Sequence, residues 1–211
     1  PDSLLNIVGN FIHLQIEEKE DWEGLKYKKE SLIFPRYHQW KVVTKLVEDS
    51  LKEGTGQKYL IQHSAGSGKS NSIAWVAHQL SSLYTGDGQK QFHSVIVVTD
   101  RLDLEAQLAR NFISGGAFGS ALATKKEGEK SKVTSGRDLA RRIGQGNDRI
   151  VFSLMHKFNT ASKLPECRND SANLVVLVDE GHRPRIGAPQ RRDETSAVTG
   201  GGAVHRAQER D

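Results

Sequence analysis

The feature that most constrains this fold is a short apolar strand that runs into a Gly-rich loop and a Lys-Ser pair, over residues 59–70. The order strand, loop, helix brings backbone N–H groups and the positive end of a helix dipole around a phosphate. The expected cradle consists of Ser64, Ala65, Gly66, Ser67 and Gly68. Lys69 can reach the β- and γ-phosphates, and the Ser70 hydroxyl can ligate Mg²⁺. The segment therefore predicts a site for a nucleoside triphosphate.

This loop departs at one position from the common pattern G-x-x-x-x-G-K-[ST], because His63 stands where the first glycine is expected. The neighbouring segments still support a phosphate-binding loop, since a helix rich in apolar residues is predicted over residues 71–83, directly after it. The alternative is a plain Gly/Ser turn with Lys69 merely solvated. A histidine here is more typical of loop packing than of a ligand.

A second segment adds two carboxylates at the end of an apolar run, residues 173–178. A strand that is apolar on both faces belongs inside a parallel sheet covered by helices, and such sheets bind ligands at the carboxyl ends of their strands. Asp179 can hold the Mg²⁺ that bridges the phosphates, and Glu180 can orient and deprotonate the attacking water. The alternative is a solvated strand end.

Strand patterns alternate with helix patterns along the chain, which predicts an α/β fold of the RecA-like class with a doubly wound, mostly parallel sheet. Strands are expected at 59–61, 94–99, 149–155 and 174–178, and helices at 2–16, 37–52, 71–83 and 102–112, with a helical turn or two at 137–143. Residues 17–30 are charged and indicate a surface connection or a short hairpin. Residues 114–136 predict a long loop.

Composition limits the class of protein. The chain has 211 residues, 36% of them hydrophobic, and a net charge of +4, which permits nucleic-acid binding without requiring it. The single cysteine, Cys167, excludes an intrachain disulfide, and no signal peptide or membrane-spanning run is visible. We expect a soluble cytoplasmic protein. Pro1 in place of an initiator Met indicates a piece of a larger polypeptide.

Four stretches resemble superfamily 2 helicase-like ATPases, and most closely the motor (R) subunit of type I restriction enzymes. They are Phe34–Gln39 before the loop, the loop itself at Gln62–Ser70, Thr99–Leu108 with its D-R-x-D-L-x-x-Q pattern, and Asp179–Arg183. The last is similar to a DEAH box with Gly181 where Ala is usual. The resemblance covers roughly residues 3–187.

The resemblance implies a motor domain that hydrolyses ATP with Mg²⁺ to translocate double-stranded DNA. It also implies that the protein works in a complex with methyltransferase and specificity subunits and does not bind a membrane. It divides the chain into an N-terminal helical linker segment (1–33), a RecA-like motor domain 1 (34–187) and a tail (188–211). The tail lacks apolar periodicity and is expected to be disordered.

Residue roles are also carried over from the resemblance. It implies that Gln39 hydrogen-bonds the adenine edge with Arg36 nearby, and that Lys69, Asp179 and Glu180 carry the catalysis. The alternative for Gln39 is an ordinary exposed helix residue.

Three further residues are implied in coupling or DNA contact. His182 would link the nucleotide site to later motifs, or would be a structural histidine. Thr99 and Arg101 would lie near the DNA-facing loop, although a surface charge or an ion pair at a helix start explains Arg101 as well.

The sequence also departs from the family. It shows no convincing nuclease motif before the motor, and no Thr-Pro motif or second RecA-like domain with its arginine after it. Since such an arginine is worth ~10³–10⁵ in rate, we expect the chain to bind Mg-ATP and hydrolyse it very slowly. The alternatives are a fragment of a generic superfamily 2 helicase or another P-loop ATPase, a truncated product that acts only as a nucleotide- or subunit-binding module, and a decayed product without activity.

Overall fold

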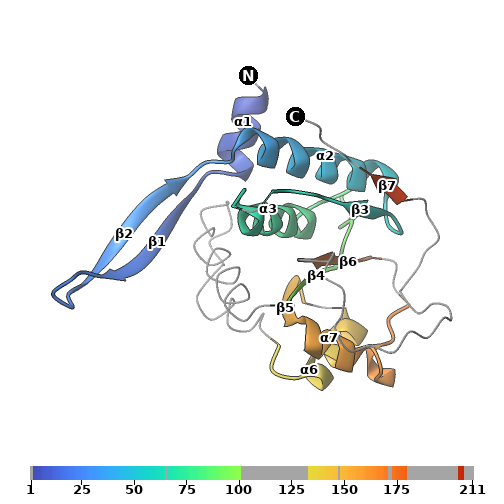
Figure 1. The fold of residues 1–211 in the computed structure, drawn as a ribbon. Coiled ribbons are helices and arrows are strands. Elements are labelled where there is room, and N and C mark those ends of the chain that lie inside the picture. Colours follow the sequence, from blue (N-terminus) through green and yellow to red (C-terminus); the bar gives the residue numbers. More distant parts are fainter. Residues whose placement is uncertain are drawn as a thin grey trace.

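The structure is a computed structural model that describes residues 2–64, 66–100, 133–146, 148–170, 173–179 and 204–206. Its described elements are α1 (Asp2–Asn10), β1 (His13–Glu20), β2 (Lys26–Ile33), α2 (Tyr37–Glu53), β3 (Lys58–Leu60), α3 (Lys69–Ser81), β4 (Ser94–Thr99), α6 (Gly136–Gln145), β5 (Ile150–Leu154), α7 (Met155–Ala161), the 3₁₀ turn η2 (Pro165–Cys167), β6 (Leu174–Val178) and β7 (Val204–Arg206) (Figure 1).

The centre of the molecule is a parallel three-stranded sheet in the order β5-β4-β6. In the middle strand, Val95 lies beside Ile150 on one neighbour and Val175 on the other. Every residue of β4 and of β5 is buried. Such complete burial is typical of parallel strands that have helices on both faces.

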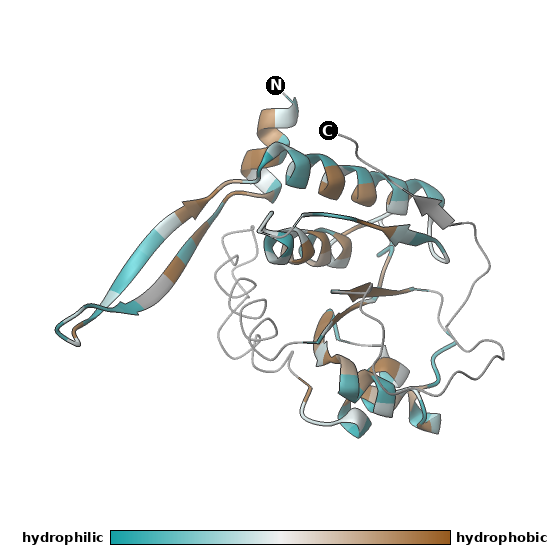
Figure 2. Ribbon diagram, viewed as in Figure 1, coloured by the Kyte–Doolittle hydropathy of each residue, from teal (hydrophilic) through white to brown (hydrophobic). Residues whose placement is uncertain are grey.

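Side chains alternate between the two faces of this sheet, and each face has its own core. Val95 and Val97 of β4 join a cluster with residues of α2 and α3. Ile96 and Val98 join a second cluster with residues of α6 and α7. Figure 2 shows the apolar strands of the sheet between these two layers of helices. The predicted α/β class, with helices on both faces of a parallel sheet, is confirmed.

The strand before the Gly-rich loop is not part of that sheet in the described structure. β3 pairs in parallel with β7, with Lys58 beside Val204 and Leu60 beside Arg206. Tyr59 nevertheless packs against the same core cluster as α2 and α3. The prediction of a strand here is confirmed, but the described hydrogen bonds place it in a separate two-stranded ladder.

The N-terminal segment differs from the predicted helix over 2–16. Helix α1 ends at Asn10, and β1 and β2 form an antiparallel hairpin in which His13 lies beside Ile33 and Glu20 beside Lys26. The hairpin projects from the body of the molecule (Figure 1). A helix end after Gly9 fits the low helix propensity of glycine. Of the two alternatives for residues 17–30, the hairpin is confirmed.

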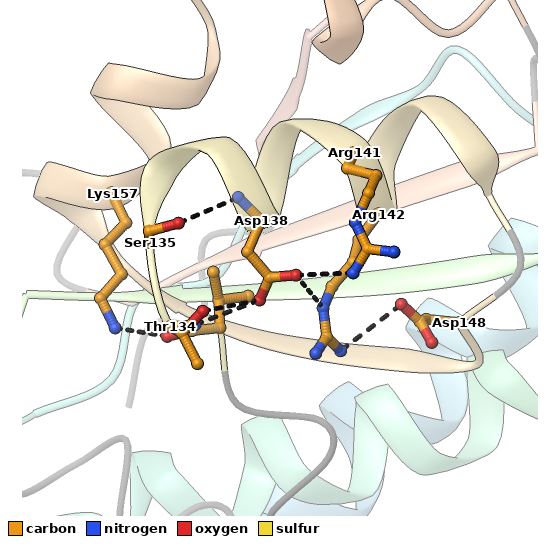
Figure 3. A network of polar contacts seen from close by, with 8 residues as sticks. Thr134, Ser135, Asp138, Arg141, Arg142, Asp148 and Lys157 are labelled. Atoms are coloured by element: carbon orange, nitrogen blue, oxygen red, sulfur yellow. Dashed lines mark hydrogen bonds and ion pairs between the residues drawn. The ribbon is translucent and has the colours of Figure 1, made fainter.

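Helix α6 begins with a network of polar contacts, shown in Figure 3. The Ser135 hydroxyl accepts a hydrogen bond from the Asp138 N–H at 3.1 Å, which is a helix N-cap. The Asp138 carboxylate contacts Arg141 at 3.0 Å and Arg142 at 3.2 Å. Burial acts to raise the pKa of Asp138, but these hydrogen bonds and that from the Thr134 N–H outweigh it and lower the pKa to about 2.

Other predicted elements fall partly or wholly outside the described residues. The helix over 102–112 and residues 114–132 of the predicted long loop lie there. The disordered tail over 188–211 stays a prediction, apart from residues 204–206, which form β7. Among the described helices, none is long and apolar enough to cross a membrane.

Candidate functional site

The Gly-rich loop (Ser64–Gly68) connects β3 to α3 through two residues with positive φ. Gly66 has φ 73° and Gly68, the residue before α3, has φ 82° and ψ 36°, in the left-handed region. The carbonyl of Gly68 then accepts hydrogen bonds from the N–H groups of Asn71 (3.0 Å) and Ser72 (3.3 Å), which start the helix. The loop therefore delivers its backbone to the positive end of α3, as an anion site requires.

Several polar groups of the loop have no hydrogen-bond partner among the described residues. Among the described residues, none accepts a hydrogen bond from the backbone N–H of Gly66, Gly68 or Ser70. The Ser67 hydroxyl is buried and also has no partner in the described part of the chain. The buried Ser67 hydroxyl is costly without a partner, whereas Gly66 and Gly68 are exposed, so that a bound oxyanion can reach their N–H groups. These N–H groups and this hydroxyl are suited to donate hydrogen bonds to the oxygens of a phosphate chain.

Gln39 is buried at the start of α2, with 3% of its surface exposed, and contacts the loop directly. Its Nε2 donates to the carbonyls of Ser67 (3.1 Å) and Gly68 (2.9 Å), and its Oε1 accepts from the N–H of Arg36 (2.8 Å). The alternative of an ordinary exposed helix residue is therefore wrong. The adenine contact implied by the resemblance stays a prediction. Arg36 itself is exposed at the N-terminus of α2.

Two histidines pack against each other beside the loop, and one of them, His38, had no predicted role. The His38 Nε2 lies 3.4 Å from the Ser67 carbonyl oxygen, and the rings of His38 and His63 have centroids 5.3 Å apart. His63 thus contacts an aromatic neighbour next to the loop, as the packing interpretation proposed. The position of His38 directly before Gln39 was the only sequence signal for its contact.

The side chains predicted to hold phosphate and metal come from the loop, from the first turn of α3 and from the end of β6. Lys69 and Ser70 are half-buried in the first turn of α3, and Ser64 is exposed. Asp179 is 8% exposed directly after β6, and its N–H donates to the Val98 carbonyl at 2.9 Å. This bond extends the β4–β6 ladder by one residue and places Asp179 at the carboxyl end of the parallel sheet.

Four other predicted residues lie outside the described part of the chain: Ala65, Arg101, Glu180 and His182. Thr99 is described and is completely buried at the end of β4. A direct contact between Thr99 and DNA would therefore require its side chain to become exposed, and that role stays a prediction.

The residues present fit Mg²⁺ and a triphosphate. Unpaired loop donors and a buried hydroxyl suit an anion, while a hydroxyl and a carboxylate oxygen, from Ser70 and Asp179, are ligands that Mg²⁺ prefers. Gly68 leaves room for the Gln39 side chain beside the loop, because a Cβ there would lie 2.5 Å from the Gln39 Nε2.

Comparison with known proteins agrees with this geometry. The type I restriction enzyme HindI endonuclease subunit of Haemophilus influenzae is 27% identical over 209 residues, which cover 95% of this chain and 18% of that subunit. The chain thus spans less than a fifth of the relative's length. No solved structure gives a significant match. The family model for the SWI2/SNF2 ATPase matches residues 38–198, from the start of α2 to beyond Asp179, and so the chain belongs to the SWI2/SNF2 ATPase family, whose ATPase domain is RecA-like.

Proposed function

We propose that this chain is the ATP-binding half of an ATP-dependent double-stranded DNA translocase, the motor of a restriction endonuclease subunit. Membership of the SWI2/SNF2 ATPase family supports the ATP-driven motor. The similarity to a type I restriction enzyme endonuclease subunit supports the restriction complex, with methyltransferase and specificity subunits as partners.

The observation that carries the proposal is the state of the Gly-rich loop. The carbonyls of Ser67 and Gly68 accept hydrogen bonds from the Gln39 amide. The N–H groups of Gly66, Gly68 and Ser70 have no acceptor among the described residues. A loop with paired carbonyls and unpaired N–H groups at a helix N-terminus is built to bind an anion.

Four of the candidate residues have a chemical role in this proposal. Lys69 binds the β- and γ-phosphates as a point charge, and Glu180 orients the attacking water and accepts its proton. Ser70 and Asp179 hold Mg²⁺, which neutralises negative charge on the phosphates when it is bound. Asp179 is suited to this because it is nearly buried, so its charge is only weakly screened by solvent.

Hydrolysis by the 211 residues alone is proposed to be slow. In related NTPases an arginine from outside the phosphate loop stabilises the transition-state charge and contributes ~10³–10⁵ in rate. The resemblance assigns that arginine to a second RecA-like domain. Binding of Mg-ATP, which uses the loop and Asp179, does not depend on it.

Titration with a fluorescent ATP analogue, with and without Mg²⁺, tests the proposal. The chain should bind saturably and in a Mg²⁺-dependent manner, and Lys69→Ala should abolish binding. Lys163→Ala is the matched control, because Lys163 is an exposed lysine after α7. Equal affinity for both variants, or no binding by a chain that circular dichroism shows to be folded, would contradict the proposed nucleotide site. Co-purification with the other subunits in the absence of nucleotide binding would favour a pure subunit-binding module instead.

A further inference from the structure

Both N–H donors of the Gln39 amide are used by the protein in this structure. A side-chain amide has two N–H donors, and Gln39 directs them to two successive backbone carbonyls, of Ser67 at 3.1 Å and of Gly68 at 2.9 Å. Its oxygen accepts from the Arg36 N–H at 2.8 Å. The same amide cannot donate to a nucleobase while it holds both carbonyls.

Those two bonds constrain two successive peptide planes, and the second plane is also held by the N–H groups of Asn71 and Ser72 at the start of α3. In a trans peptide the C=O of one residue and the N–H of the next point in opposite directions. A bond that holds the Ser67 carbonyl toward Gln39 therefore turns the Gly68 N–H away from it. The bond to the Gly68 carbonyl does the same for the N–H of Lys69. Both N–H groups belong to the turn that enters α3.

The Gln39 side chain lies so close to Gly68 that a side chain at this position would collide with it. A Cβ on Gly68 would lie 2.5 Å from the Gln39 Nε2, and the φ of Gly68 is +82°. The Ser67 carbonyl is also approached by the His38 Nε2 at 3.4 Å. Two consecutive side chains of α2 thus fix one edge of the loop.

From this geometry we infer that Gln39 is a positioning residue for the phosphates: it holds the peptide planes that follow Ser67 and Gly68 so that the N–H groups of Gly68 and Lys69 face the bound triphosphate. The inference rests on the proposed function and deepens it. It differs from the role that the resemblance implies, because a positioning residue affects every triphosphate alike, whereas a residue that reads adenine affects only adenine nucleotides.

The test compares the affinity of Mg-ATP, Mg-GTP and inorganic tripolyphosphate for the unmodified chain and for Gln39→Met. Methionine has a similar volume and no N–H donor. Gln79→Met is the matched control, because Gln79 also donates to a backbone carbonyl, that of Asn10, but not to the loop. Gln39→Met should weaken all three ligands by the same factor, on the order of tenfold for the loss of two hydrogen bonds. Gln79→Met should leave all three affinities unchanged.

The possible results separate the two proposals. Loss of ATP affinity alone, with tripolyphosphate unaffected, would overturn the positioning role and leave the nucleotide site intact. Failure of the unmodified chain to bind any of the three ligands would overturn the proposed function itself.

A second measurement does not depend on the variant folding. In the unmodified chain, tripolyphosphate should shift the amide proton resonances of Gly68 and Lys69 downfield, while the Gln39 side-chain amide protons keep their shifts and their protection. A Gln39 side chain that moves with ATP and not with tripolyphosphate would contradict the inference.

Discussion

The indole Nε1 of Trp75 donates a 2.9 Å hydrogen bond to the backbone carbonyl of Phe11, and the two rings have centroids 5.5 Å apart. Both side chains are essentially inaccessible to solvent. The bond joins the turn between α1 and β1 to α3, the helix that follows the Gly-rich loop. A second contact, from the Trp40 Nε1 to Asn6 at 3.0 Å, ties α1 to α2. Helix α1 and the turn after it are therefore attached to α2 and α3, and Phe11 is part of the core.

Substitution of Trp75 should reveal this dependence. Trp75→Phe removes the indole donor and part of the buried ring, and should lower the free energy of unfolding by roughly 2 kcal/mol. Urea unfolding measures the change. Trp22→Phe is the control, because Trp22 is 91% exposed at the end of the hairpin and should change stability by no more than about 0.5 kcal/mol. Equal effects of the two substitutions would show that the Trp75–Phe11 contact contributes nothing.

The sequence predicted the central strands well because their pattern has one cause. Residues 95–98 and 174–178 are continuous apolar runs, and the strands predicted over 94–99 and 174–178 have those bounds in the structure. Burial of β4 on both faces favours apolar residues at its four central positions, so the signal is strong. In β6 the run is just as apolar, but Val176 and Val178 are exposed among the described residues. The sequence pattern of the hairpin is weaker, because charged residues fill most of it and each of its strands pairs with only one neighbour among the described strands.

Other features could not be predicted because they depend on distant parts of the chain. Pairing of β3 with β7 joins segments that are far apart in sequence and has no local pattern. The burial of Gln39 depends on where the Gly-rich loop lies, which is 28 residues further along the chain. Motif similarity identified Gln39 as important, but only the structure shows that its amide holds two backbone carbonyls.

The N-cap of α6 should contribute to stability in isolation from the nucleotide site. Ser135→Ala removes the oxygen that accepts from the Asp138 N–H, and should lower the free energy of unfolding by about 1 kcal/mol. Ser162→Ala is the control, because the Ser162 hydroxyl is exposed and donates only to the nearby Asn159 carbonyl. Thermal unfolding of both variants measures the difference. A Ser135 variant as stable as the control would mean that Asp138 and its arginines hold the helix start without the cap.

His78 should make the protein less stable in mild acid. Burial, with a smaller contribution from the Arg149 guanidinium, lowers the pKa of His78 to about 4 from 6.5. Between these values the unfolded chain binds a proton that the folded chain does not, so stability is full above pH 6.5 and falls as pH drops toward 4. The slope from one such group is at most about 1.4 kcal/mol per pH unit.

Unfolding curves at several pH values check this expectation. His78→Gln should flatten the dependence between pH 6.5 and 4, while His156→Gln, at an exposed position of α7, should leave it unchanged. Burial also lowers the pKa of His13, so the slope should decrease in the His78 variant without disappearing. A slope identical in the His78 variant and the parent chain would show that other groups cause the acid sensitivity.

DNA binding, if the proposed translocase function holds, should be weak, independent of sequence and strongly dependent on salt. The chain carries a net charge of +4, and non-specific binding rests on phosphate contacts that release counterions. The logarithm of the association constant should fall linearly with that of the salt concentration, by about 0.9 per phosphate contacted. Fluorescence anisotropy with two unrelated duplexes measures both properties.

Arg101→Ala should reduce the slope by about one, while Arg168→Ala should not, because Arg168 is exposed and paired with Asp170 at 3.2 Å. An affinity that differs between the duplexes, or that does not change with salt, would rule out phosphate contacts as its basis.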